Sequence, residues 1–296
     1  MKKYVILISV YNDWESVFKL TKEIDLLIAK WDAEVSILIV NDASTEKRES
    51  IELNFKNIKS LKVINMIKNR GHARCHAAGL KFLTEKEDFN YVVLMDGDGE
   101  DRPEELTSIY NKSKENPAKV ITADRMKRSE GPFFKFLYEC HKILTFVFTG
   151  KFVKFGYYSC LPKHAVNLLI KESSLWSSFT GSLVKTISDR TPVPTKRGKR
   201  YYGKSQMNLF KLLVHSFSII AVFKKSVITR SFLFIIFYTF FIYDNLSVIT
   251  LLPILSVFIF LFIILKVSAR ENIEELNSSL QNIGSIDILS DLNSRQ

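Results

Sequence analysis

Two carboxylates stand directly after an apolar run in the stretch 91–106, which reads YVVLMDGDGEDRPEEL. The apolar residues predict a short buried strand, which places Asp96 and Asp98 at its carboxyl end. Ligands bind at that edge of open α/β sheets, and paired carboxylates there can hold a hard divalent cation together with phosphate oxygens. The plainer alternative is a surface turn, because Asp and Gly often form turns. We favour the site for a cation and phosphate. The roles of the next two acidic residues, Glu100 and Asp101, stay open.

Predicted strands and helices alternate along residues 1–123, and they must position these carboxylates. Apolar runs predict strands over 4–10, 34–40, 61–66, 91–95 and 118–123. Helices are predicted over 14–29 and 71–82, near 49–55, and from a start at Arg102-Pro103-Glu104-Glu105. This alternation predicts a mostly parallel, doubly wound, Rossmann-like α/β sheet. The first turn lacks the GxGxxG of dinucleotide sites, and the GxxxxGK[ST] loop of ATP sites occurs nowhere in the chain.

Basic residues recur beyond the fifth predicted strand. Arg125 and Arg128 are three apart and would share one side of a helix next to the pocket, although a solvated charged face explains them equally well. A strand and a helix are predicted within 152–170, a helix over 176–187 and a strand over 191–195. The segment 196–205 is too polar and glycine-rich for a core and predicts a basic loop that orders on anionic ligands.

The net charge of +11 is concentrated in one part of the 296-residue chain. Eleven basic residues and one acid lie between Lys185 and Arg230. This block runs into the most hydrophobic part of the chain, so membrane phosphates explain it better than nucleic acid, which we exclude as a partner. The three cysteines are far apart without CxxC spacing, which indicates buried, inert, reduced thiols in a cytosol-facing protein.

The C-terminal third predicts attachment to a membrane. Residues 206–226 predict an amphipathic helix that lies at the interface, and 227–267 predict a transmembrane hairpin with spans at about 228–243 and 246–266. The first span is short, and it reaches across the membrane only if the Arg230 side chain snorkels to the interface. If this first segment does not span, the C-terminal tail would lie on the outer side of the membrane. Basic residues at both ends favour a hairpin with both ends cytoplasmic. The tail, 268–296, has mild helical periodicity and no recognisable chemistry.

Six motifs occur in a fixed order before the hairpin: VILISVYND, IVNDAST, NRGHARCHAAGL, VVLMDGDGEDRPEE, ADRMKRSEG and RYYGKSQ. In their order and spacing the chain resembles the family 2 glycosyltransferases of GT-A fold, from Lys3 to about Val267. Within that family it is most similar to the polyprenyl-phosphate group of dolichyl-phosphate mannose synthase and bactoprenol glucosyl transferase. The resemblance implies a GT-A nucleotide-sugar-binding domain over residues 1–205, in a multi-pass protein of the cytoplasmic membrane whose catalytic domain faces the cytosol.

The resemblance also implies an activity and a set of residues. The activity is metal-dependent, inverting hexosyl transfer from a UDP- or GDP-linked sugar to an undecaprenyl-type polyprenyl phosphate, for cell envelope polysaccharide. Asp96 and Asp98 would hold Mg²⁺ or Mn²⁺ at the diphosphate, and Asp42 would accept a hydrogen bond from the base. The implied donor-binding residues are Ser9, Tyr11, Asn12, Asp13, Asp42, Asn69, Gly71 and Asp96. The implied phosphate-binding residues are Arg125, Arg128, Arg200, Lys204 and Ser205, and the catalytic set is Asp96, Asp98, Arg125 and Arg128.

Two motifs depart from the family pattern. Ser9 stands where the first motif usually has proline, which alters how the turn meets the base, and DGDGEDRPE replaces the common DxDxQDPPE. His72 and His76 are four apart on a predicted helix, but no third metal ligand stands at a matching spacing. We therefore interpret the two histidines as a helix face packed beside the pocket.

The acceptor decides between two enzymatic hypotheses. A lipid phosphate is already an anion at pH 7 and attacks without a general base, whereas a hydroxyl of a polysaccharide or lipid-linked oligosaccharide needs one. The candidate bases, Asp101, Glu172 and Asp189, stand in no recognised motif, which favours the phosphate. A third hypothesis is a non-catalytic membrane scaffold with a relic transferase fold. The sequence also leaves a homo-oligomer open.

Overall fold

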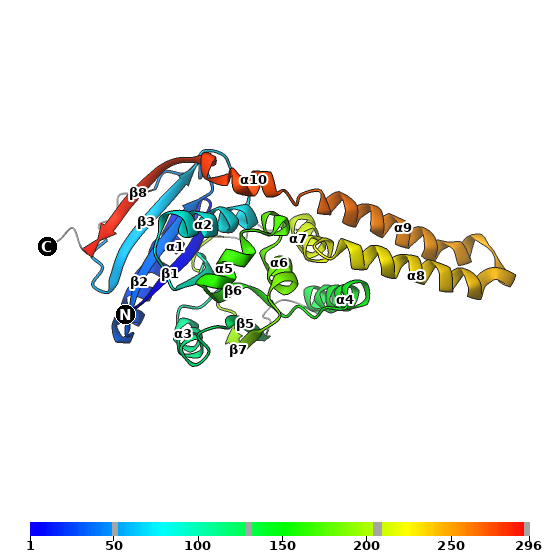
Figure 1. Ribbon diagram of the computed structural model, residues 1–296, viewed down its shortest axis with the longest axis horizontal. Helices are drawn as coiled ribbons and strands as arrows, with labels where there is room; N and C mark the ends of the chain where they lie inside the picture. Colours follow the sequence, from blue (N-terminus) through cyan, green and yellow to red (C-terminus); the bar gives the residue numbers. More distant parts are fainter. Residues whose placement is uncertain (49–52, 128–131, 204–208, 293–296) are drawn as a thin grey trace.

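A mixed sheet of eight strands forms the centre of the structure, a computed structural model that describes residues 1–48, 53–127, 132–203 and 209–292 (Figure 1). The strand order is β7-β5-β6-β4-β1-β2-β3-β8. The strands are β1 (Lys2–Val10), β2 (Ala33–Asn41), β3 (Ile58–Met66), β4 (Tyr91–Asp96), β5 (Val120–Lys127), β6 (Phe155–Pro162), β7 (Arg190–Lys196) and β8 (Ile283–Asp291).

Six of these strands run in one direction, and β6 and β8 run against them. The pairs β1·β2, β1·β4, β2·β3 and β5·β7 are parallel, while β6 pairs antiparallel with both β4 and β5. The carboxyl ends of β1, β4 and β5 therefore share one edge of the sheet, where Ser9 lies in register with Asp96. The prediction of a mostly parallel α/β sheet is confirmed, and the antiparallel β6 between β4 and β5 is an addition to it.

Helices cover both faces of the sheet. One face carries α1 (Trp14–Leu27), the short η1 (Ile28–Lys30) and α3 (Glu105–Glu115), and the other carries α2 (His72–Lys86), α5 (Lys163–Leu169), η2 (Ser173–Trp176) and α6 (Phe179–Thr186). Both faces of β1 are apolar because its side chains alternate between them. Ile6 and Ile8 pack in the core under α1, and Val5 and Leu7 pack in the core under α2. The helix predicted near 49–55 is not confirmed: 49–52 lie outside the described residues, and Leu53–Phe55 form no helix.

Asp25 joins the end of α1 to the start of β3. It is 6% exposed, and its carboxylate accepts hydrogen bonds from the backbone N–H groups of Lys56, Asn57 and Ile58. Asp25→Ala leaves these donors without their acceptor, so we expect the free energy of unfolding to fall by roughly 3 kcal/mol. Chemical unfolding in detergent followed by circular dichroism measures the change. Asp32→Ala, at an exposed position just beyond α1, is the matched control, and an equal effect of the two would contradict this role.

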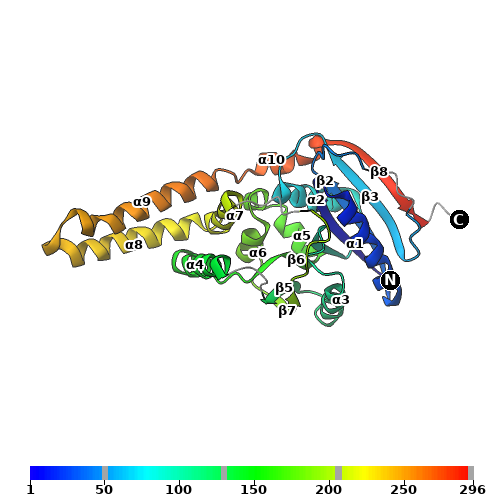
Figure 2. The same cartoon turned by 180° about the vertical axis from the view of Figure 1, so that it is seen from behind.

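Two long helices project from the domain as a hairpin (Figures 1 and 2). They are α8 (Lys224–Ile242) and α9 (Val248–Ser268), joined by η3 (Tyr243–Asn245). At 1.5 Å per residue these helices are about 28 and 31 Å long, close to the thickness of a hydrocarbon core. By length and composition both could cross a membrane, and α8 begins at Lys224, before the start of the first predicted span at about residue 228. The helix is therefore longer than the predicted span.

The base of the hairpin is packed against two further helices. These are α7 (Leu209–Ala221), within the predicted amphipathic segment, and α4 (Pro132–Thr149). Ile220 and Ala221 of α7 form a small core with Val227 of α8 and Ile264 of α9. Arg230 Nη1 donates to the backbone oxygen of Val147 in α4 at 2.9 Å. These contacts fix the hairpin to the domain on the side of α6 and α7.

The tail after α9 returns to the sheet, which the sequence did not predict. It forms α10 (Ile273–Asn277), η4 (Ser279–Asn282) and then β8, which pairs antiparallel with β3 at the edge of the sheet (Figure 1). The predicted helical periodicity is correct only for the first part of the tail. Lys224 Nζ and Glu271 Oε2 are 3.0 Å apart, so the two ends of the hairpin meet. The chain before α8 and the chain after α9 consequently lie on the same side of it.

Candidate functional site

The acidic turn after β4 is shaped by two glycines. A Cβ at Gly97 would lie 2.7 Å from Val17 Cγ2 and 3.0 Å from Ile8 Cγ2, so only glycine lets the turn lie this close to the core. Gly99 has φ +87°, and the ring of Tyr201 packs where its Cβ would be, at 2.6 Å. The DGDG sequence therefore brings Asp96 and Asp98 to the carboxyl edge beneath a side chain from a distant segment.

That segment is the basic loop, residues 197–203, which closes over the acidic turn. Arg200 Nη1 donates to Asp98 Oδ2 at 2.7 Å, and its Nη2 forms an ion pair with Asp13 at the start of α1. The backbone N–H of Tyr201 also donates to the Asp98 carbonyl oxygen at 2.8 Å. One guanidinium thus joins the turns that follow β1 and β4, the arrangement to which its planar fork is suited.

Glu100 and Asp101, which had no assigned role, hold the loop and the turn in place. Glu100 forms an ion pair with Arg197, and the N–H of Gly198 donates to the Glu100 carbonyl oxygen at 2.8 Å. Asp101 is 2% exposed, and its Oδ2 accepts a hydrogen bond from the backbone N–H of Asp96 at 3.0 Å. We assign positioning roles to both. Asp101 fixes the backbone of Asp96, and Glu100 anchors the basic loop.

The carboxylates fit a divalent cation once Arg200 moves. Asp98 Oδ1 accepts from the N–H of Glu100 at 2.9 Å and Oδ2 from Arg200, so the guanidinium now supplies the positive charge that a cation would bring. Carboxylate oxygens at a sheet edge are suitable ligands for Mg²⁺ or Mn²⁺. A cation at Asp98 would compete with Arg200 for Oδ2, and a displaced guanidinium would have its fork free for phosphate oxygens.

The predicted donor residues of the first motif connect the first two turns of the edge. Asn12 has φ +51°, in the left-handed region that asparagine tolerates. Its Oδ1 accepts from the N–H of Thr45 at 2.8 Å, and its N–H donates to Ser44 Oγ at 3.0 Å. Asn12 therefore positions the turn, while Tyr11, with 41% of its surface exposed, lies open at the edge.

Asp42 holds the turn that leads into α2. Its two carboxylate oxygens accept from the backbone N–H groups of Arg70 and Gly71, each at 2.8 Å. Gly71 has φ +90° and precedes the first residue of α2, and Asn69 is exposed beside it. The observed contacts give Asp42 a positioning role, and its direct contact with a base stays a prediction.

The structure describes the side chain of only one of the five predicted phosphate-binding residues, Arg200. Arg125 lies in β5, where its backbone pairs with Thr195, so it does not share a helical face with Arg128 as the spacing suggested. Arg128, Lys204 and Ser205 lie outside the described residues. Of this set Arg200 is the one whose side chain the structure brings to Asp98.

Two histidines that we interpreted as packing lie against Ser9 and Asp96. Ser9 Oγ is 2.8 Å from His72 Nδ1 and 3.1 Å from His76 Nε2, and His72 Nε2 is 3.3 Å from Asp96 Oδ1. Burial lowers the pKa of His76 well below its usual value and also lowers the pKa of His72. The fully buried imidazole of His76 is therefore neutral at pH 7. A third potential metal ligand is Asp96, which the spacing along the helix did not reveal because it comes from strand β4.

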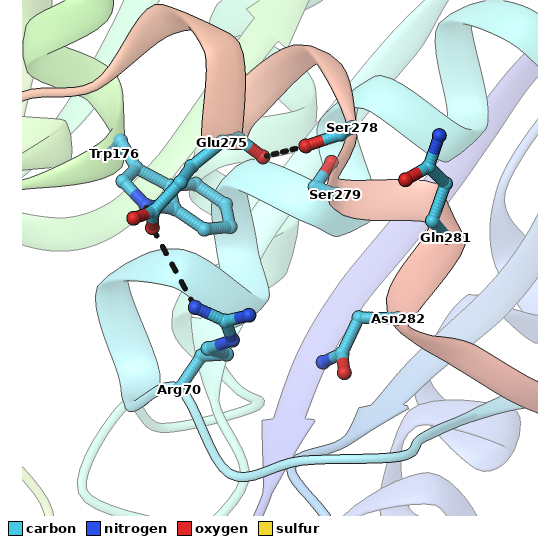
Figure 3. A pocket seen from close by; sticks show the side chains of 7 residues that line it. All are labelled: Arg70, Trp176, Glu275, Ser278, Ser279, Gln281 and Asn282. Carbon is cyan, nitrogen blue, oxygen red and sulfur yellow. Dashed lines mark hydrogen bonds and ion pairs between the residues drawn. The ribbon is translucent and has the colours of Figure 1, made fainter.

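A small cavity of about 180 Å³ lies beside the α2 turn (Figure 3). Glu275 of the returning tail accepts a hydrogen bond from Trp176 Nε1 at 2.6 Å and is 3.6 Å from Arg70 Nη1. Figure 3 shows its carboxylate between the indole ring and the guanidinium. Nothing in the sequence near Glu275 indicated this contact, because it depends on the return of the chain after the hairpin.

The remaining candidates lie in ordinary surroundings. Glu172 pairs with Lys185 at 2.7 Å, and Asp189 pairs with Lys119 at 3.1 Å at the amino end of β7, the edge opposite the acidic turn. Neither is a general base at this site.

Cys75 and Cys160 are buried free thiols, and burial raises the pKa of Cys160 to about 12, as expected for inert thiols. Cys140 is free but only half-buried, which corrects the expectation for that residue.

Comparisons with known proteins agree with this geometry. The model of a family described as glycosyl transferase family 2 matches residues 5–179. The chain is similar to the undecaprenyl-phosphate 4-deoxy-4-formamido-L-arabinose transferases of Proteus mirabilis (strain HI4320), 24% identical over 218 residues, and of Klebsiella pneumoniae (strain 342), 23% identical over 220 residues. Each match covers 72% of this chain and 65% of the relative, so the chain spans slightly less than two thirds of their length.

Solved structures of two synthases share the fold. A glucosyl-3-phosphoglycerate synthase from Mycobacterium tuberculosis, in complex with Mn²⁺, uridine-diphosphate and glucosyl-3-phosphoglycerate, has a TM-score of 0.54 at 12% identity, over 76% of this chain and 80% of that one. A mannosyl-3-phosphoglycerate synthase from Rubrobacter xylanophilus has a TM-score of 0.52 at 11% identity, over 76% and 73%. The predicted GT-A fold is thereby confirmed.

Proposed function

This chain belongs to glycosyl transferase family 2, and from that premise we propose that it transfers a sugar from a nucleotide-diphosphate sugar to a polyprenyl phosphate at a membrane. The observation that carries the proposal is Arg200, held between Asp98 and Asp13 at the carboxyl edge of the sheet. A guanidinium there can exchange two carboxylates for phosphate oxygens when the donor binds. The transferases of Proteus and Klebsiella, which are named for undecaprenyl phosphate, support the choice of acceptor.

The donor would bind across the ends of β1, β2 and β4. Asp13 and Tyr11 would face the nucleoside, and Asp96 and Asp98 would hold a divalent cation at the diphosphate. The cation, when bound, stabilises charge on the departing nucleoside diphosphate. Asp101 keeps the backbone of Asp96 in place, so the acidic turn is preorganised before the donor arrives.

The acceptor would attack without a general base. A phosphate oxygen bonds to the anomeric carbon from the face opposite the leaving diphosphate, whose bond to that carbon breaks, and the configuration inverts. The leaving group departs with its electron pair, and no proton has to be removed from a phosphate that is already ionised at pH 7. Of the three carboxylates that could have served as a base, Asp101 is buried and accepts from a backbone N–H, and Glu172 and Asp189 are in ion pairs elsewhere.

The membrane side of the site would be formed by the hairpin and the helices at its base. Many apolar side chains of α8 and α9 are exposed, among them Phe237 at 63% and Phe262 at 68%, a pattern that suits lipid rather than water. Lys224, Lys225 and Arg230 precede or begin the hairpin and Lys266 and Arg270 end it, which supports an orientation with the catalytic domain in the cytosol.

The proposal is tested by the product. The full-length protein, reconstituted in phospholipid vesicles, is incubated with radiolabelled UDP- and GDP-sugars one at a time, together with undecaprenyl phosphate and Mg²⁺ or Mn²⁺. We expect label from one donor to enter the lipid extract in a form that mild acid releases. Absence of lipid-extractable label with every donor, while the protein still binds a nucleotide, would contradict the proposed acceptor.

A further inference from the structure

His72, His76 and Asp96 form a compact set of potential metal ligands beside the acidic turn. His72 is the first residue of α2, His76 lies one turn further along, and Asp96 is the last residue of β4. One ligand atom of each lies within 4.8 Å of the others, and His72 Nε2 is 3.3 Å from Asp96 Oδ1. Two imidazoles and one carboxylate are a ligand set that binds transition metals, often with further positions open.

The surroundings of the two imidazoles resemble the outer shell of a metal site. Metal-bound histidines almost always use their second ring nitrogen in a hydrogen bond that fixes the ring. Here Ser9 Oγ contacts Nδ1 of His72 and Nε2 of His76, which leaves Nε2 of His72 facing Asp96. The ring of Tyr157 packs edge-on against both imidazoles, with centroids 4.5 and 4.9 Å away. The serine that replaces the usual proline thus has a defined task.

An unpaired buried nitrogen gives independent support for a ligand. His76 is fully buried, and its Nδ1 has no hydrogen-bond partner among the residues that the structure describes. Such an atom has lost its hydrogen bonds to water without a replacement, which is unfavourable, so buried polar atoms in folded proteins nearly always have a partner. A metal ion between the two histidines and Asp96 would supply one.

We infer that His72, His76 and Asp96 bind one divalent transition-metal ion, of the range from Mn²⁺ to Zn²⁺, in preference to Mg²⁺. Imidazole nitrogen suits the later ions of this series best and Mn²⁺ least, whereas Mg²⁺ is bound mainly by oxygen ligands. The inference differs from the cation site at Asp96 and Asp98, because Asp98 contributes no ligand and stays paired with Arg200. The two sites share Asp96, and binding of the metal alone can be measured without sugar transfer.

Metal titration of the full-length protein tests this inference without donor or acceptor. After removal of metals by a chelator, the protein in detergent is titrated with Mn²⁺, Zn²⁺ or Mg²⁺, and bound metal is measured by equilibrium dialysis and elemental analysis. We expect one equivalent of Mn²⁺ or Zn²⁺ to bind at least about tenfold more tightly than Mg²⁺. His72→Gln is expected to weaken binding of Mn²⁺ and Zn²⁺ roughly tenfold or more.

Two controls separate this site from others. His164→Gln removes an exposed histidine from α5, and Asp88→Asn removes an exposed carboxylate at the opposite edge of the sheet, and both should leave Mn²⁺ and Zn²⁺ affinity unchanged. His76→Gln should match His72→Gln, but His76 is buried, so the variant at His72, whose side chain is 40% exposed, decides the test. Unchanged affinity in His72→Gln, or loss of the same affinity in Asp88→Asn, would overturn the inference.

Discussion

Asp98→Asn is expected to lower the rate of sugar transfer roughly 10²- to 10³-fold while the protein remains folded and inserted in the membrane. Asp98 is the carboxylate that would hold the cation at the diphosphate, and its Oδ2 now binds Arg200 at 2.7 Å. The amide keeps the shape of the side chain and can still accept the hydrogen bond from Glu100 N–H. The loss should therefore come from the missing negative charge rather than from a changed turn.

The measurement is initial transfer rate in vesicles at saturating donor, with the membrane-bound amount of each variant determined in parallel. Asp88→Asn is the matched control, since it removes an exposed carboxylate that pairs with Lys3 and Lys163 at the opposite edge of the sheet. Equal rates for wild type, Asp88→Asn and Asp98→Asn would argue against a catalytic role. If cellular function were also unchanged in Asp98→Asn, the scaffold hypothesis would be favoured.

Arg200→Ala is expected to reduce transfer about 100-fold and to raise the KM for the donor. The guanidinium joins Asp98 and Asp13, and in the proposed mechanism it moves from these carboxylates to phosphate oxygens. Its removal would leave two carboxylates close to the diphosphate without their positive partner. Arg200→Lys should recover only part of the rate, because an ammonium group cannot form a fork with two oxygens.

Lys199→Ala provides the comparison for Arg200, because Lys199 is the preceding residue of the same loop and is exposed. We expect its kcat and KM to stay within about twofold of the wild type. Rates and KM values are determined with the donor that gives label in the lipid extract. Equal losses in Lys199→Ala and Arg200→Ala would mean that the charge of the loop matters and that the position of Arg200 does not.

The parallel part of the sheet was largely predictable from the sequence. The positions of its two antiparallel strands, β6 and β8, were not. Continuous apolar runs identify β1, β2 and β4 because both faces of these strands are buried. The sequence of β6 also predicts a strand, but nothing in it shows that the strand lies antiparallel between β4 and β5. β8 was missed because its side chains are mostly exposed or half-buried, and its position depends on the hairpin bringing the chain back to β3.

The site was predictable as a location but not as a set of contacts. The position of Asp96 and Asp98 after a buried strand was sufficient to place the acidic turn. The partners of that turn come from residues about 100 positions away, and no local spacing connects Arg200 with Asp98 or Arg197 with Glu100. The closeness of Asp96 to the two histidines was missed for the same reason, because i, i+4 spacing shows only the two potential ligands on the helix and Asp96 lies on a strand.

The most direct test of the central claim compares two acceptors that differ only in the phosphate. The reconstituted protein is given its active nucleotide sugar with either undecaprenyl phosphate or undecaprenol, and radiolabel in the lipid extract is measured over time. We predict a product from undecaprenyl phosphate that mild acid cleaves, and no product from the alcohol, because none of the three candidate bases among the described residues is available to activate a hydroxyl. Transfer to undecaprenol at a comparable rate, or to a polysaccharide hydroxyl with undecaprenyl phosphate unused, would contradict it.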